Sequence, residues 1–151
     1  MATTLKIGDK APAFTGINEK EETVKLADFK GKKLVLYFYP HDNTPTCTEE
    51  ACNLRDNYHT FLAKGYNILG VSEDSVKKHQ NFIKKHELPF SLLADTDHVI
   101  HNQYGVWGEK TMYGKKYMGT IRTTFIIDEK GKIEDIIEKV EAKNHSTQIL
   151  G

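Results

Sequence analysis

Uninterrupted apolar runs mark the buried strands of this chain. The strongest are Lys33–Tyr39, Tyr66–Val71, Ser91–Ala94 and Thr123–Ile127, and Ile133–Val140 is predicted to be a further strand. Short runs of aliphatic and aromatic residues between turn residues are typical of strands that are covered on both faces. The runs therefore predict a central sheet with two buried faces.

Three segments between these strands are predicted to be helical. They are Pro45–Lys64, Ser75–His86 and a shorter segment near Thr96–Tyr104. The first ends at Gly65, because glycine is favoured just after a helix. The second stops before Pro89, because proline disfavours the helical conformation of the residue before it.

The order of these elements predicts the fold class. Strands and helices alternate first, and the tight turn Asp128–Gly131 joins the last two strands as a hairpin. The sequence therefore predicts an α/β fold with a central mixed sheet flanked by helices. In such sheets, sites lie beyond the carboxyl ends of strands, where helices begin. The segment between Tyr39 and Pro45 is such a place.

The composition is typical of a globular protein in a reducing compartment. The 151 residues, 38% of them hydrophobic, include 21 Lys plus Arg and 21 Asp plus Glu. We expect one domain over residues 1–151, with no nucleic-acid or membrane partner, because the charge is balanced and no apolar stretch could span a bilayer. Residues 1–6 lack the apolar core of a signal peptide, so a cytoplasmic location is expected. There, two cysteines favour redox or catalytic chemistry over a structural role.

The two cysteines lie five residues apart, and the first falls where a helix begins. Asn43 or Thr44 suits the helix cap and Pro45 suits its first position. Cys47 then lies in the first turn, beside unpaired backbone N–H groups and the positive end of the helix dipole. That environment lowers the pKa of a thiol, so a reactive thiolate at Cys47 is the leading hypothesis.

Other fates of the two cysteines fit less well. A buried structural thiol is the commonest, and it suits Cys52 with its apolar neighbours better than Cys47, whose neighbours are polar and turn-forming. A zinc site commonly takes two cysteine pairs, and the chain has one pair and seven scattered histidines. A thioredoxin-type dithiol shows Cys-x-x-Cys, whereas the spacing here is Cys-x4-Cys. A disulfide exchanger remains the alternative enzyme.

The spacing also constrains any bond between the two sulfur atoms. Five residues along an α-helix put the Cα atoms of Cys47 and Cys52 about 8 to 9 Å apart. A disulfide needs Cα atoms within about 7 Å of each other. Either part of the helix unwinds before these residues are joined, or the disulfide is intermolecular.

The segment Pro40–Cys47 resembles the peroxiredoxin active-site pattern Pro-x-x-x-Thr-x-x-Cys. The second cysteine, Cys52, is similarly placed in the peroxiredoxin Q, or bacterioferritin comigratory protein, subfamily. Further matches lie in order along nearly the whole chain, at Gly8–Phe14, Gly70–Ser72 and Ile121–Asp128. Thr46 departs from the subfamily, in which glycine is common at that position.

The resemblance implies a thioredoxin-like fold and the reduction of hydroperoxides, with no cofactor or metal required. By that match Cys47 attacks the peroxide and becomes a sulfenic acid, and Cys52 condenses with it. Pro40, Thr44 and Arg122 form the pocket around the attacking sulfur. Thioredoxin or a similar dithiol protein then reduces the disulfide, and a monomer is expected because the resolving cysteine is in the same chain. The non-enzymatic alternative is a peroxide sensor that passes its disulfide to a partner.

Three further features each have two interpretations. His41 lies near Cys47 and suits proton transfer, but an exposed loop histidine is the simpler interpretation. Glu50 either completes a helix cap or hydrogen-bonds Arg122 in support of the site. The glycine-rich region 105–119 fits a substrate edge or a folded loop.

Overall fold

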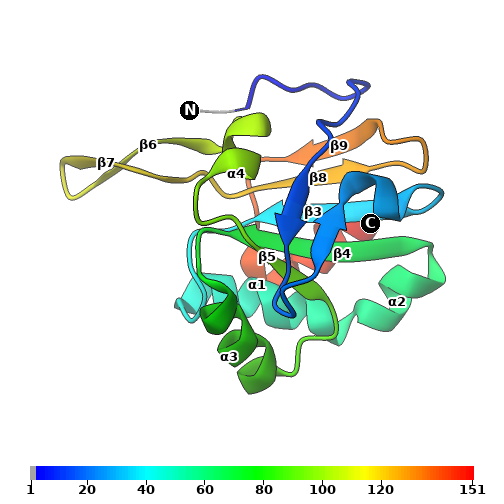
Figure 1. The fold of residues 1–151 in the computed structure, drawn as a ribbon, viewed down its shortest axis with the longest axis horizontal. Coiled ribbons are helices and arrows are strands. Elements are labelled where there is room, and N and C mark those ends of the chain that lie inside the picture. The colour runs from blue at the N-terminus through cyan, green and yellow to red at the C-terminus, as the bar shows by residue number, and fades with distance from the viewer. Residues whose placement is uncertain (1–2) are drawn as a thin grey trace.

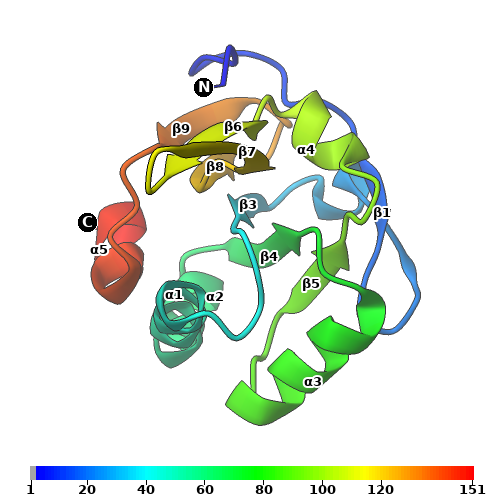
Figure 2. The same cartoon turned by 90° about the vertical axis from the view of Figure 1, so that its left-hand side faces the viewer.

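The computed structural model describes residues 3–151; residues 1 and 2, the start of the segment expected not to be a signal peptide, lie outside that range. A five-stranded sheet forms the centre, in the order β5-β4-β3-β8-β9 (Figures 1 and 2). Its strands are β3 (Lys33–Phe38), β4 (Tyr66–Ser72), β5 (Ser91–Ala94), β8 (Thr123–Ile127) and β9 (Ile133–Ile137). β3, β4 and β5 are parallel, whereas β8 is antiparallel to β3 and β9. The predicted mixed sheet is confirmed.

Helices cover both faces of the sheet (Figure 2). One face carries α1 (Pro45–Asp56), α2 (Tyr58–Ala63), α3 (Val76–His86) and α5 (His145–Leu150), which follows the short 3-10 helix η2 (Ala142–Asn144). The other carries α4 (Val99–Gln103), the hairpin of β1 (Thr15–Ile17) and β2 (Thr23–Lys25), and the 3-10 helix η1 (Leu26–Phe29). Within the described residues, no helix combines the length and apolar character needed to cross a membrane.

Each face of the sheet has its own hydrophobic core, and β3 contributes to both. Successive side chains of a strand point to opposite faces. Leu36 and Phe38 accordingly pack with the residues of α4 and the N-terminal segments. Val35 and Tyr37 pack with those of α1 and α3. Burial on both sides explains why β3 appears in the sequence as a continuous apolar run.

The predicted helix over Pro45–Lys64 is two helices, because the chain breaks at Asn57. The Asn57 side-chain amide donates to the Asn53 carbonyl at 2.8 Å and so occupies an acceptor of the helix end. Gly65 follows the second helix with a φ of 84°, as its predicted role requires. Helix α3 starts after Ser75, whose hydroxyl accepts from the backbone N–H three residues on.

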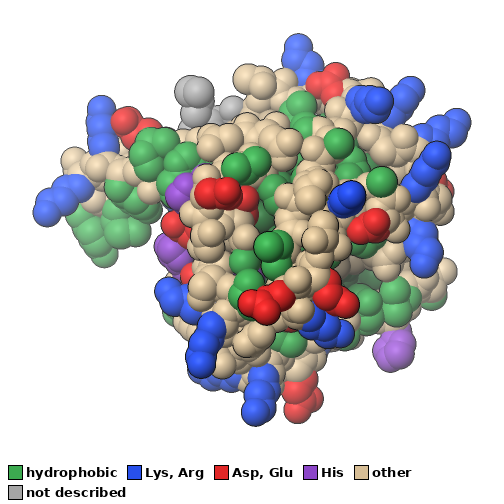
Figure 3. Space-filling view, in the orientation of Figure 1, with side chains coloured by type: hydrophobic (Ala, Val, Ile, Leu, Met, Phe, Trp, Pro, Cys, Tyr) green, Lys and Arg blue, Asp and Glu red, His purple; other side chains and the backbone are tan. Residues whose placement is uncertain are grey.

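Residues 105–119 contain a hairpin rather than the loop expected from their glycines. Strands β6 (Trp107–Met112) and β7 (Lys115–Thr120) pair antiparallel and project from the body of the molecule (Figure 1). Tyr113 and Gly114 form the turn with φ of 52° and 77°, which defines a type I′ turn. Tyr-Gly is not one of the usual type I′ pairs, so the hairpin carries no strong sequence signal. Its tip is hydrophobic and exposed (Figure 3), with 98% of Tyr113 accessible.

Candidate active site

Cys47 lies in the first turn of α1, just beyond the carboxyl end of β3. Thr44 is the N-cap residue and Pro45 is the first helical residue, as the sequence predicts. The Thr44 side chain does not cap the helix, because its hydroxyl donates to the His41 carbonyl at 3.1 Å. The Thr48 N–H makes the first intrahelical bond, to the Thr44 carbonyl at 2.9 Å. The N–H groups before it have no acceptor within the helix and present positive charge there.

Arg122 joins the Cys47 sulfur to a buried carboxylate. Its Nη2 donates to Cys47 Sγ at 3.0 Å, and its Nη1 donates to Glu50 Oε1 at 2.5 Å. Glu50 follows Cys47 by three residues, so both side chains lie on one face of α1. Arg122 immediately precedes β8, and the pairing of β8 with β3 brings it to this end of the sheet. The guanidinium fork therefore holds a cation against the sulfur, which favours the thiolate.

Glu50 is fully buried, and its charge is balanced near neutral pH. Burial raises the pKa of Glu50 to about 7, against the opposing effect of Arg122. The second carboxylate oxygen lies 3.5 Å from Nε2 of His145, which also contacts the Thr124 hydroxyl at 2.8 Å. Burial, together with Arg122, lowers the pKa of His145. His145 belongs to α5, and no sequence motif marked it as part of the site.

Cys47 itself is nearly enclosed. It is 1% exposed, whereas the side chain of Arg122 is 19% exposed. The polar sequence neighbours of Cys47 had argued against a buried thiol, and the structure corrects that expectation. Pro40 and Thr44, in the loop between β3 and α1, are half-buried. The residues around the sulfur thus meet the solvent more than the sulfur does.

Cys52 lies further along α1 and faces a different helix. Its Sγ is 3.9 Å from Nδ1 of His86, the last residue of α3, and the cysteine is half-buried. Both cysteines are unbonded. Since Cys47 and Cys52 belong to one uninterrupted helix, the premise of the distance argument is confirmed. The two sulfur atoms are joined only if that helix opens.

A buried network fixes the loop before Cys47. Asp42 accepts from the Tyr39 hydroxyl at 2.6 Å and contacts His79 Nδ1 at 2.7 Å. The Asp42 N–H donates to the Asp74 carboxylate at 2.7 Å, and His79 Nε2 contacts the Leu93 carbonyl at 2.9 Å. Asp42, Asp74 and His79 could together offer ligand atoms to a metal ion, since these lie within 4.8 Å of one another. Their atoms are already hydrogen-bonded within the fold, so the geometry favours a structural role.

The two-way interpretations of His41 and Glu50 are now resolved in part. His41 has a side chain that is 52% exposed and lies 3.5 Å from the Asp74 carboxylate, which agrees with an exposed loop histidine. Glu50 bonds Arg122 and does not act as a cap. Its position three residues after Cys47 was the sequence signal for this contact.

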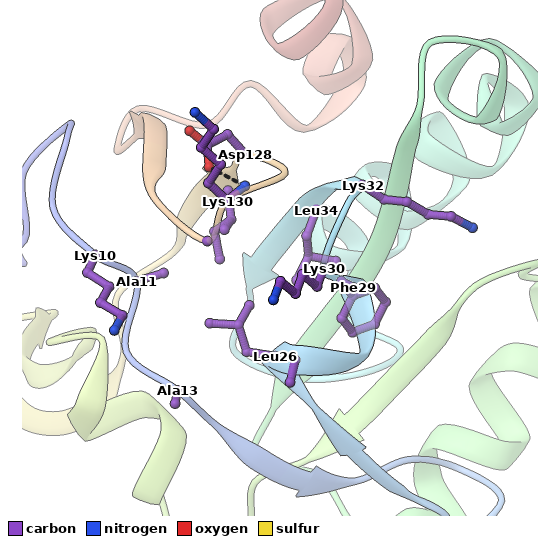
Figure 4. Close-up of a pocket in the computed structure, with 13 residues that line it drawn as sticks. Lys10, Ala11, Ala13, Leu26, Phe29, Lys30, Lys32, Leu34, Asp128 and Lys130 are labelled. Atoms are coloured by element: carbon purple, nitrogen blue, oxygen red, sulfur yellow. Dashed lines mark hydrogen bonds between the residues drawn. The ribbon is translucent and has the colours of Figure 1, made fainter.

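A hollow of about 200 Å³ lies at the opposite end of the sheet (Figure 4). Leu26, Phe29 and Leu34 give it an apolar floor, and Lys30 and Lys130 stand at its edge. It is next to the first residues of β3, whereas Cys47 follows the last. The hollow is therefore separate from the cysteine site.

Comparison with known proteins shows the family. The AhpC/TSA family pattern matches residues 7–136, which is most of the chain. The chain belongs to the AhpC/TSA family. The putative peroxiredoxin bcp of Coxiella burnetii is 47% identical over 148 residues, which are 98% of each protein. Peroxiredoxin Bcp of Bacillus subtilis is 47% identical over 147 residues, 97% of this chain and 94% of that protein.

A solved structure gives the same result for the fold. It is that of the bacterioferritin comigratory protein of Xanthomonas campestris, a protein studied for its alkyl peroxide reduction activity. The TM-score is 0.87 at 33% identity, over 98% of this chain and 94% of that one. The predicted subfamily and thioredoxin-like fold are confirmed. This peroxiredoxin is a thiol-dependent peroxidase, which acts on peroxides at the expense of a thiol reductant.

Proposed function

We propose that Cys47 is the residue of this peroxiredoxin that attacks the peroxide, and that Cys52 resolves the oxidised product. One observation carries the first assignment: Arg122 Nη2 lies 3.0 Å from Cys47 Sγ. A guanidinium at that distance stabilises an anionic sulfur, and the thiolate is the nucleophilic form of cysteine. Cys52 has no such contact with Arg122 and lies on the part of α1 that faces α3.

In the first step the Cys47 thiolate attacks the terminal peroxide oxygen. The S–O bond forms as the O–O bond breaks, so sulfur is oxidised to a sulfenic acid and the peroxide is reduced. Hydroxide or alkoxide leaves and takes a proton to become water or an alcohol. Ionising a thiol of pKa about 8.5 gains at most about thirtyfold at neutral pH. The larger part of the rate must come from orienting the peroxide and stabilising its developing charge.

Three residues fit those remaining roles. Arg122 supplies a fixed fork of donors to the peroxide oxygens as well as to sulfur. The Thr44 hydroxyl, now donating to a loop carbonyl, is able to donate to or accept from a peroxide oxygen. Pro40 lacks an N–H and shapes the loop without competing for the substrate.

In the second step Cys52 condenses with the sulfenic acid, and water leaves. Because α1 must open for this, the disulfide is presented to a dithiol reductant, and we propose thioredoxin or a similar protein. A resolving cysteine in the same chain needs no second subunit, so the proposed enzyme is a monomer, in the cytoplasm. Hydrogen peroxide and alkyl hydroperoxides are the proposed substrates, the latter supported by the activity studied in the Xanthomonas relative.

Two serine variants test these assignments. Cys47→Ser should abolish peroxide consumption, and Cys52→Ser should consume one equivalent of peroxide and then stop with thioredoxin as reductant. Stopped-flow peroxide consumption and mass measurement after alkylation separate the two outcomes. Normal consumption by Cys47→Ser would refute the first assignment. Fast reduction of insulin disulfides without peroxidase activity would support a disulfide exchanger, and a regulatory protein trapped by Cys52→Ser would support a sensor.

A further inference from the structure

We propose that His86 is a further catalytic residue of the second step, in which it removes the proton from the Cys52 thiol. The inference rests on the proposed function, because it requires Cys52 to be the resolving residue. His86 Nδ1 lies 3.9 Å from Cys52 Sγ, within hydrogen-bonding range for sulfur. Only the thiolate form of Cys52 attacks a sulfenic acid, so a base at this position has chemistry to perform.

Contacts on two sides hold the His86 imidazole against Cys52. Arg55, three residues after Cys52 on α1, donates from Nη1 to the His86 carbonyl at 2.8 Å. The imidazole packs edge-on against Phe82, with ring centroids 5.0 Å apart. The base is therefore placed before any oxidation occurs.

The charges around His86 keep its imidazole able to accept a proton. Burial is the main cause that lowers the pKa of His86, and the cations Lys85 and Arg55 add to it. A histidine with a lowered pKa is neutral at neutral pH, so a ring nitrogen is free to take the thiol proton.

Arg55 also stabilises the thiolate that this proton transfer leaves behind. A hydrogen bond to Asp56 is the main cause that raises the pKa of Arg55, and the charges of Cys52 and Glu87 contribute. The guanidinium thus remains a cation close to the Cys52 sulfur. Such a cation favours the thiolate, and Asp56 and Glu87 are the acids that moderate it.

Cys52 can keep this environment while Cys47 moves, because the two halves of α1 are held differently. The second half is fixed by the Arg55 bond to α3 and by Asn53 Oδ1, which accepts from the Ser146 N–H at 2.7 Å. The first turn has no side-chain cap, and its charge-assisted bond from Arg122 to sulfur weakens when the thiolate becomes a neutral sulfenic acid. The first half therefore unwinds and carries Cys47 towards Cys52.

The step then balances without any further reagent. The Cys52 S–H proton moves to His86 Nδ1, and the resulting thiolate attacks Cys47 Sγ. The S–S bond forms as the S–O bond of the sulfenic acid breaks. Hydroxide leaves, takes the proton from the imidazolium and becomes water. Cys52 is oxidised, the sulfenic sulfur of Cys47 is reduced, and His86 returns to its neutral form.

The test is His86→Asn, with His59→Asn as a matched control on the exposed surface of α2. Each protein receives one equivalent of hydrogen peroxide. Sulfenic acid formation is followed with a trapping reagent and disulfide formation by mass after rapid alkylation, from pH 6 to pH 9. At pH 7 we expect disulfide formation in His86→Asn to be about 10 to 30-fold slower, because an unassisted thiol of pKa about 8.5 is only a few per cent ionised. The difference should disappear near pH 9, where Cys52 ionises without help.

Each other outcome has a defined meaning. A wild-type rate of disulfide formation at pH 7, or equal slowing at pH 7 and pH 9, would overturn the base role of His86. Sulfenic acid formation should be unchanged in both variants. Its absence from the wild-type protein would instead overturn the assignment of Cys47, so the two failures are distinguishable. If His86→Asn does not fold by circular dichroism, His86→Gln provides the same readout.

Discussion

Arg122 contacts Cys47 across 75 residues of sequence, with 3.0 Å between Nη2 and Sγ. The same guanidinium holds Glu50, so sulfur, cation and carboxylate form one electrostatic unit. Pairing of β8 with β3 sets this contact, because it aligns the start of one strand with the end of the other. The reactivity of the sulfur therefore depends on sheet register as well as on the helix that carries it.

Replacing Arg122 by lysine should separate charge from geometry. Arg122→Lys keeps a cation but loses the fork that serves sulfur, carboxylate and peroxide together. We expect the second-order rate constant of the first oxidation to fall about 100-fold, which is typical for the loss of one oriented donor. Stopped-flow measurement of that phase is the readout. Lys116→Gln, which removes an exposed cation from β7, should leave it unchanged; a similar loss in both variants would argue against a specific role.

Glu50 should make stability fall as the pH rises towards neutrality. Burial raises its pKa from 4.5 to about 7, so the fold favours the protonated carboxyl. The stabilisation is complete below pH 4.5 and is lost as the pH rises through 7, a change of about 3 kcal/mol at most. Urea unfolding of wild type and Glu50→Gln between pH 4 and pH 9 measures it. The difference between their free energies of unfolding should change with that sign, and a constant difference would contradict the raised pKa.

The His79 network should be important for stability. His79→Leu leaves the Asp42 carboxylate and the Leu93 carbonyl buried without this partner. Loss of one member of a buried charged or hydrogen-bonded pair costs about 3 kcal/mol. Urea denaturation gives the value. The exposed His59→Leu should change it by less than about 0.5 kcal/mol, and a loss below about 1 kcal/mol in His79→Leu would show that the network contributes little.

Oxidation should open only the first half of α1. Amide hydrogen exchange of the disulfide form should show lost protection over residues 45–51, while residues 52–56 keep theirs, because they remain bonded to α3 and α5. Helix α3 (Val76–His86) serves as the internal reference. Loss of protection along the whole of α1 would contradict the proposed division of the helix.

Local patterns were enough to predict the strands of the central sheet and the start of α1. The four strongest strands agree with the structure to within one residue at each end, because parallel strands buried on both faces are apolar throughout. Weaker elements were missed for the same reason. The β6–β7 hairpin has exposed faces and an unusual turn pair, and α5 is short, so neither has a strong periodic signal.

By itself, the sequence determined that Cys47 stands at the start of a helix and that Cys52 lies in that same helix, too far away for a direct bond. Both follow from neighbouring residues and from the fixed geometry of the helix. Only the tertiary structure decided that Cys47 is buried, that Glu50 and His145 share its site, and that Cys52 faces His86. Those contacts join segments far apart in the chain, and their distances depend on strand register and helix packing, which no local pattern specifies.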